Sequence, residues 1–180
     1  MNQRLDKLVW SYDDHGDRHV APAKLLAWCD YSYDMGDPRY QGSLVEVRLS
    51  DSELRPPANL PRPFIDAFDW LVKNDIHVHE AVISAIDNYL PTLQKQWERL
   101  RDKELNAITY VSDMKNKLNL AYVKIFPHQK DGLPYIGFDF DCIWDAESGF
   151  KVLLNGARVV GLQLDELSIK AVKSDGGKDH

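Results

Sequence analysis

The fold is decided by residues 134–162, which read PYIGFDFDCIWDAESGFKVLLNGARVVGL. Side chains of a strand alternate between its two faces, so one face of the strand near 135–144 carries only apolar residues. These are Ile136, Phe138, Phe140, Cys142 and Trp144. The pattern predicts a core strand of an antiparallel sheet.

Two turn signals indicate where the neighbouring strands begin and end. The Asn155-Gly156 pair is typical of a two-residue type I′ hairpin loop, which pairs Leu154 with Ala157. The same register pairs Val152 with Val159 and Phe150 with Gly161, and leaves a mixed opposite face that is open to solvent or a partner. Upstream, Asp131-Gly132 follows a strand at 120–126, whose apolar face we expect to carry Ala121, Val123 and Ile125.

The first 100 residues divide into strands and helices. Strand-like runs at 8–10, 24–28 and 43–49 are followed by a proline-rich connector at 55–63. Apolar residues at helical spacing begin at Phe64, and Asp75 is a candidate N-cap of a second helix. Pro91 indicates one bent helix or two stacked helices. The stripe expected to cover the sheet contains Val82, Ile86, Tyr89 and Trp97.

These elements predict an α+β fold, with a largely antiparallel sheet and a mid-chain helical layer on one face. We expect one domain over residues 1–180, with N-terminal strands at about 7–49, helices at about 63–101 and a C-terminal sheet at about 118–165. Residues 171–180 are polar and are expected to be disordered.

Composition narrows the class of protein. The chain has 180 residues and a formal net charge of -6, without the basic excess that nucleic-acid binding requires. It has no apolar run of about 18 residues and no secretory signal, so we expect a cytoplasmic protein that does not enter the membrane. Cys29 and Cys142 lie far apart without metal-ligand spacing, which favours free, buried thiols. No cofactor motif is present.

The stretch from Tyr135 to Gly149, followed by 156–160, resembles the signature of an uncharacterised bacterial domain family of unknown function. That signature is Y-x-G-F-x-F-x-C-x-W-D-x-E-x-G with a following R-V-V, and the resemblance extends over about 64–162. It implies no established activity, although the association of such families with toxin loci implies an immunity or protein-binding role. The chain departs from the pattern at Ser148, where a histidine is common, and at Gly161, where an acidic residue is common.

The candidate binding residues are the carboxylates Asp139, Asp141, Asp145 and Glu147. Such oxygen ligands can bind a divalent ion, but their spacing matches no known ion loop. Local hydrogen bonds in a turn explain them better. A second candidate, His15 with His19, lies in a glycine- and aspartate-rich stretch that favours a loop over a metal site.

Two functions remain. The preferred one is a non-enzymatic protein-binding module, of an immunity type or otherwise, whose acidic surface meets a basic partner. The alternative is a divalent-metal-dependent enzyme that uses the carboxylates at 139–147. No residue pattern indicates a catalytic nucleophile, and no metal or cofactor is assigned.

Overall fold

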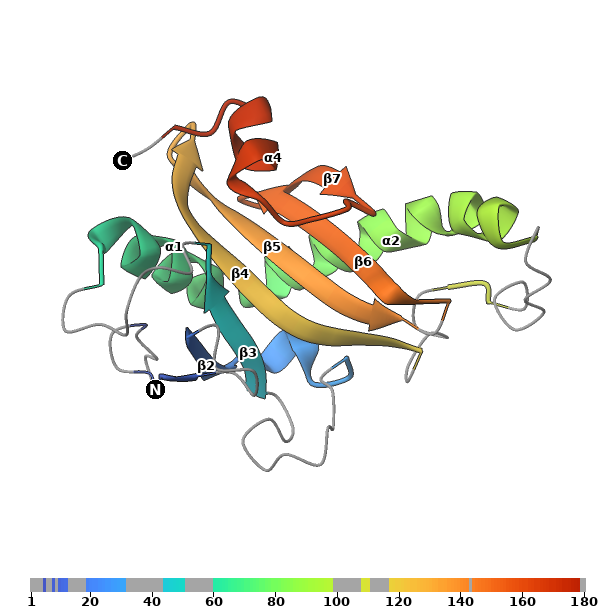
Figure 1. The fold of residues 1–180 in the computed structure, drawn as a ribbon, viewed down its shortest axis with the longest axis horizontal. Helices are drawn as coiled ribbons and strands as arrows, with labels where there is room; N and C mark the ends of the chain where they lie inside the picture. The colour runs from blue at the N-terminus through green and yellow to red at the C-terminus, as the bar shows by residue number, and fades with distance from the viewer. Residues whose placement is uncertain are drawn as a thin grey trace.

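The computed structural model describes residues 5, 8, 10–12, 19–31, 44–50, 60–98, 108–110, 117–142 and 144–178. Within them, seven strands form one sheet in the order of the sequence (Figure 1). Neighbouring strands are antiparallel except for β3 and β4, which are parallel and are connected through the long helices. The expected α+β class is therefore confirmed. The elements are β1 Ser11–Tyr12, β2 His19–Lys24, η2 Leu26–Trp28, β3 Leu44–Leu49, α1 Arg62–Lys73, α2 Asp75–Glu98, β4 Leu118–Lys130, β5 Leu133–Cys142, β6 Asp145–Asn155, β7 Arg158–Leu162 and α4 Ile169–Ser174.

Helices α1 and α2 cover one face of the sheet and lie behind it in Figure 1. The apolar face of β5 is buried there as the alternation predicts, and Phe138 and Phe140 are both fully buried. Trp28 of η2 stacks on Phe138, with ring centroids 4.8 Å apart. Val82 and Ile86 of α2 belong to the same core, whereas the side chain of Trp97 lies outside the described residues.

Helix α2 continues through Pro91 as one helix, which is one of the two expected alternatives. Two other details of the segment around it differ from expectation. Asp75 is the first residue of α2 and not a cap, because its Oδ2 accepts a hydrogen bond at 3.0 Å from the backbone N–H of Ala27. That bond ties α2 to η2, a 3-10 turn where the sequence predicted strand. The expectation of a strand at 24–28 is therefore wrong beyond Lys24, where β2 ends.

The two C-terminal hairpins occur where turn residues predict them, but the second differs by one residue. In the β4–β5 turn, Asp131 and Gly132 both have positive φ, 54° and 75°. In the β6–β7 hairpin, Asn155 pairs with Arg158, so the loop is Gly156-Ala157 and the predicted Leu154–Ala157 pairing is wrong. Only Gly156, at φ 59°, has positive φ in this loop, as in a type II′ turn and not the expected type I′.

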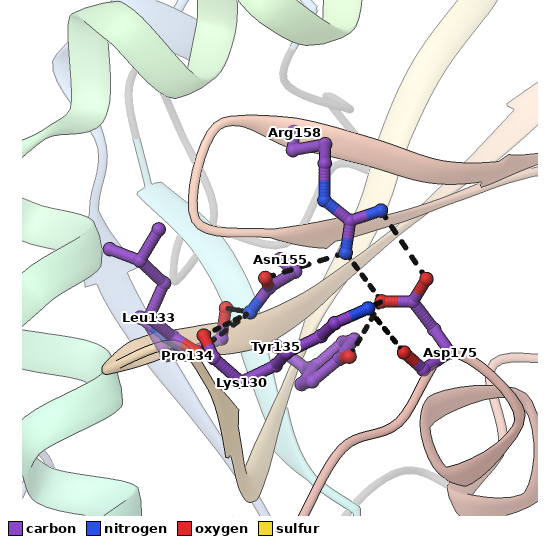
Figure 2. A network of polar contacts seen from close by, with 7 residues as sticks. All are labelled: Lys130, Leu133, Pro134, Tyr135, Asn155, Arg158 and Asp175. Atoms are coloured by element: carbon purple, nitrogen blue, oxygen red, sulfur yellow. Dashed lines mark hydrogen bonds and ion pairs between the residues drawn. The ribbon is translucent and has the colours of Figure 1, made fainter.

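Asn155 explains the shift. Its side chain is buried, and its Nδ2 donates to the backbone oxygen of Leu133 at 2.7 Å. Because this amide binds the neighbouring β4–β5 turn, Asn155 stays in the strand and the loop begins one residue later (Figure 2). A bulge between Leu153 and Leu154 shifts the register, so that Leu154 pairs with Val159 and Val152 with Leu162.

The chain is ordered up to residue 178, contrary to the expectation of disorder from residue 171. Helix α4 lies in front of the sheet, on the face opposite α1 and α2 (Figure 1). Val172 of α4 and Leu167 before it pack on Tyr135 and Leu153 in a second apolar cluster. Beyond α4 the chain returns to β4, where Gln129 and Lys178 exchange two backbone hydrogen bonds of 2.9 and 3.1 Å.

Asp175 anchors this segment to the sheet, as Figure 2 shows. Its carboxylate accepts a hydrogen bond from the Tyr135 hydroxyl at 2.7 Å and forms ion pairs with Arg158 and Lys130. These three partners come from β5, β7 and β4, so one carboxylate joins α4 to three strands. We call Asp175 and these partners the C-terminal clasp.

Candidate functional site

The C-terminal segment covers only part of the second sheet face, and a pocket of about 360 Å³ lies on that same face. The pocket is formed by β3, β4, β5 and β6, including residues 147–149 near the start of β6. Charged side chains and one tyrosine dominate its lining. They are Glu46, Arg48, Tyr122, Asp139, Asp141, Glu147 and Lys151.

The floor of the pocket is a row of side chains that crosses four strands. Glu46 pairs with Tyr122, Tyr122 with Asp139, and Asp139 with Lys151. Residues directly opposite each other in a sheet point to the same side, so register alone brings these four groups together. Their charges along the row are negative, neutral, negative and positive.

A bulge in β4 makes the row possible. Leu120 pairs with Phe140, but the next pair is Tyr122 with Asp139, so Ala121 is an extra residue. The expectation that Ala121 shares the core face with Val123 and Ile125 is therefore wrong, because the extra residue interrupts the alternation and Ala121 is not among the buried core residues. The bulge reverses the alternation and turns the Tyr122 ring toward the charged face.

Both cations of the pocket are held by its own acidic groups. Arg48 forms an ion pair with Glu46, and its guanidinium carbon lies 3.8 Å from the centroid of the Tyr122 ring. The Nζ of Lys151 lies 3.7 Å from Asp139 Oδ2 and also donates to the backbone oxygen of Ser148. The Lys151 and Asp139 side chains are only 13% and 10% exposed, so water screens this pair less than a surface ion pair.

The environment raises the pKa of two of the aspartates. Burial raises the pKa of Asp139 and the negative charge of Asp141 adds to it, while a hydrogen bond from Tyr122 and the charges of Lys151 and Arg48 oppose it. Partial burial also raises the pKa of Asp141, against the attraction of Arg48 and Lys151. Carboxylates in a concave site with shifted pKa values are candidates for a binding role.

Three of the four predicted carboxylates meet in this pocket. Asp139 is nine-tenths buried on its floor, and the exposed Asp141 and Glu147 lie at its opening. Asp145 is separate: its Oδ1 accepts a hydrogen bond from the backbone N–H of Ser148 at 2.9 Å, the local turn bond that the sequence indicates. Within the part of the chain that the structure describes, no three histidine, cysteine, aspartate or glutamate side chains come together as metal ligands.

The other half of the pocket, with Glu46, Arg48 and Tyr122, was not predicted from the sequence. The signal was the alternation at 44–49, which places Glu46 and Arg48 on the polar face of a strand. Nothing local indicates that this strand lies beside β4, because the two are separated by both long helices. Of the histidine candidates, His15 lies outside the described residues, and so does the side chain of His19.

The two cysteines differ in burial. Both are free. Burial raises the pKa of Cys142 to about 12, so its thiol stays protonated at neutral pH. Cys29 is exposed, contrary to the expectation that both thiols are buried.

Comparison with known proteins identifies the family. Residues 27–167 match the model of the Domain of unknown function (DUF6985), so the chain belongs to that family. No curated protein and no solved structure matches the chain. Among the described residues, no helix is long and apolar enough to span a membrane.

Proposed function

We propose that this member of the DUF6985 family is a non-enzymatic protein-binding module whose pocket recognises a partner with a basic surface. The observation that supports the proposal is the charge of the pocket, where four carboxylates face two cations. Both cations are already engaged by Glu46 and Asp139, so negative charge remains at the opening. The net charge of -6 adds a long-range attraction for the same kind of partner.

An immunity-type role is the form of this proposal that the family resemblance implies. In that form the partner is a basic toxin that the bound chain blocks. The excess of carboxylates in the pocket supports a basic partner. A capture experiment can identify that partner.

The metal-dependent enzyme receives less support from the geometry. A site built on the carboxylates at 139–147 would require Asp145 to join the other three. Its Oδ1 instead accepts the hydrogen bond from Ser148. Lys151, a cation of the chain itself, lies against Asp139, where a bound ion would compete with it.

Capture from a lysate of the source organism tests the proposal. The bait is the tagged full chain, compared with Asp139→Asn/Asp141→Asn and with the matched control Asp66→Asn/Glu80→Gln. The control removes the same charge from exposed positions of α1 and α2, on the opposite face of the sheet. A cooperative thermal unfolding transition in each of the three baits would show that they are folded.

We expect the wild type and the control to retain one protein of basic composition that the pocket variant loses. That protein, purified, should bind the wild type in a one-to-one complex. Equal retention by all three baits would contradict the proposal. A stoichiometric divalent ion whose loss in the pocket variant abolishes a hydrolytic activity would favour the enzyme.

A further inference from the structure

The pocket contains two acidic groups that form no ion pair within the described residues, although Arg48 and Lys151 attract Asp141 at longer range. Glu46 is paired with Arg48, and Asp139 with Lys151. Asp141 and Glu147 form no hydrogen bond or ion pair within the described part of the chain, although both line the same pocket. The pocket therefore lacks one or two positive charges at its opening.

We infer that the pocket receives one lysine or arginine side chain of the partner, and that Asp141 and Glu147 are the residues that contact its charged group. This inference rests on the proposed function, because it places the basic side chain on a protein partner. Beyond that function, the contact is an ion pair between the basic side chain of the partner and the carboxylates of Asp141 and Glu147.

Gly149 keeps this site open. A Cβ atom at this position would lie 2.6 Å from the backbone oxygen of Phe140 and 3.3 Å from Asp139 Oδ1. A side chain there would cover the carboxylate on the pocket floor, whereas glycine leaves its oxygen accessible from the pocket. The φ of 66° at Gly149 also favours glycine for the backbone alone.

The cations of the pocket determine where an incoming charge can lie. Arg48 beside Glu46 and Lys151 beside Asp139 repel another cation from the floor of the pocket. Asp141 at the end of β5 and Glu147 near the start of β6 are exposed, so they attract it to the opening instead. A volume of about 360 Å³ is at the small end of the range for ligand pockets, which suits a single side chain.

The test uses three blocked pentapeptides, acetyl-Gly-Gly-X-Gly-Gly-amide, in which X is arginine, lysine or the neutral norleucine. Each is titrated into the isotopically labelled full chain at low ionic strength, and amide NMR shifts report where it binds. The variant is Asp141→Asn/Glu147→Gln, and the matched control is again Asp66→Asn/Glu80→Gln. Both pocket substitutions are at exposed positions, and the spectra of the free proteins check that the fold is kept.

We expect the arginine or the lysine peptide, or both, to shift the amides of Tyr122, Gly149 and Lys151. The norleucine peptide should not. Because two ion pairs are lost, the pocket variant should bind about fivefold more weakly or worse, while the control changes by less than about twofold. Equal weakening in both variants, shifts away from the pocket, or binding of norleucine would overturn the inference.

The outcome also separates this inference from the proposed function. If the captured partner requires Asp139 and Asp141 but no basic peptide reaches the pocket, the side-chain contact is wrong and protein binding stands. If the peptides bind the pocket but capture is equal for all baits, the pocket binds cations and the proposed partner is wrong.

Discussion

Two aspartates of this chain respond to acid in opposite directions. Hydrogen bonds from Arg158 and Tyr135 hold the pKa of Asp175 well below its usual range. Its contribution to stability is therefore complete above about pH 4 and is lost as the pH falls toward the folded-state pKa. Burial raises the pKa of Asp139, so the folded chain binds that proton more tightly than the unfolded chain. Its contribution is greatest at low pH and is lost as the pH rises through the folded-state pKa.

Asp175→Asn should lower the free energy of unfolding at pH 7 by about 1 to 3 kcal/mol, because the C-terminal clasp loses its charge-assisted hydrogen bonds. The difference from the wild type should shrink as the pH falls below about 4. Urea unfolding at pH 7 and at pH 3 measures both effects. Asp165→Asn, at an exposed position before α4, is the control and should change little. An equal effect of the two substitutions would show that the clasp does not stabilise the chain.

Asp139→Asn should show the reverse trend. The asparagine cannot ionise, so the variant escapes the cost that the wild type incurs as the pH rises. The free energy of unfolding of the variant relative to the wild type should therefore rise from about pH 4 upward, by at most about 1.4 kcal/mol per pH unit. Parallel urea series between pH 4 and pH 8 measure this difference. A relative stability that falls with pH would mean that Lys151, and not burial, determines the pKa of Asp139.

At the scale of elements, the second sheet face is divided between α4 and the pocket. Helix α4 has only six residues and one fully buried side chain, Val172, so its order depends on docking and not on helix propensity. Ser168 caps its start through Ala171 N–H, and Lys124 Nζ donates to the backbone oxygen of Leu167 at 2.8 Å. These contacts hold the segment beside the pocket.

Val172→Ala should therefore lower the free energy of unfolding by about 1 to 3 kcal/mol, since a buried side chain is shortened and a cavity remains. Lys170→Ala, at an exposed position of the same helix, should change it by less than about 0.5 kcal/mol. Denaturant melts of both variants provide the comparison. If Val172→Ala had no effect, α4 would not pack on the sheet as described.

The same elements explain what the sequence could predict. The alternation along β5 and the Asp131-Gly132 turn depend on local residue types, and both were predicted correctly. The loop at Gly156 lies one residue later than predicted, because the Asn155 side chain binds a turn more than 20 residues away in the sequence. The order of α4 depends on contacts of Asp175 with residues 17 to 45 positions earlier, which no local pattern contains.

The residues of the candidate site were also only partly predictable from the sequence. Asp139, Asp141 and Glu147 could be chosen because they are close together in the sequence. Arg48 and Tyr122 could not be assigned to them, because the parallel pairing of β3 with β4 and the bulge at Ala121 bring them together. The folded sheet pairs Arg48 with Glu46 and Lys151 with Asp139, so Asp141 and Glu147 have no ion-pair contact of their own among the described residues.

At the scale of the whole molecule, the helical layer is on one face and the charged pocket opens on the other. All pocket residues lie within the family match at 27–167, whereas α4 and Asp175 of the C-terminal clasp follow it. The central claim is that this pocket, and not net charge alone, attracts a basic protein. Long-range attraction of this kind should act mainly on the rate of association.

The most direct measurement is the association rate of the captured partner as a function of ionic strength, for the wild type, Asp141→Asn/Glu147→Gln and Asp66→Asn/Glu80→Gln. Salt screens exposed charges, so the wild-type rate should fall by about tenfold or more between about 0.03 and 0.5 M salt. The pocket variant should associate more slowly at low salt and depend less on salt, while the control stays close to the wild type. A rate that is independent of salt, or identical in the two variants, would contradict the claim.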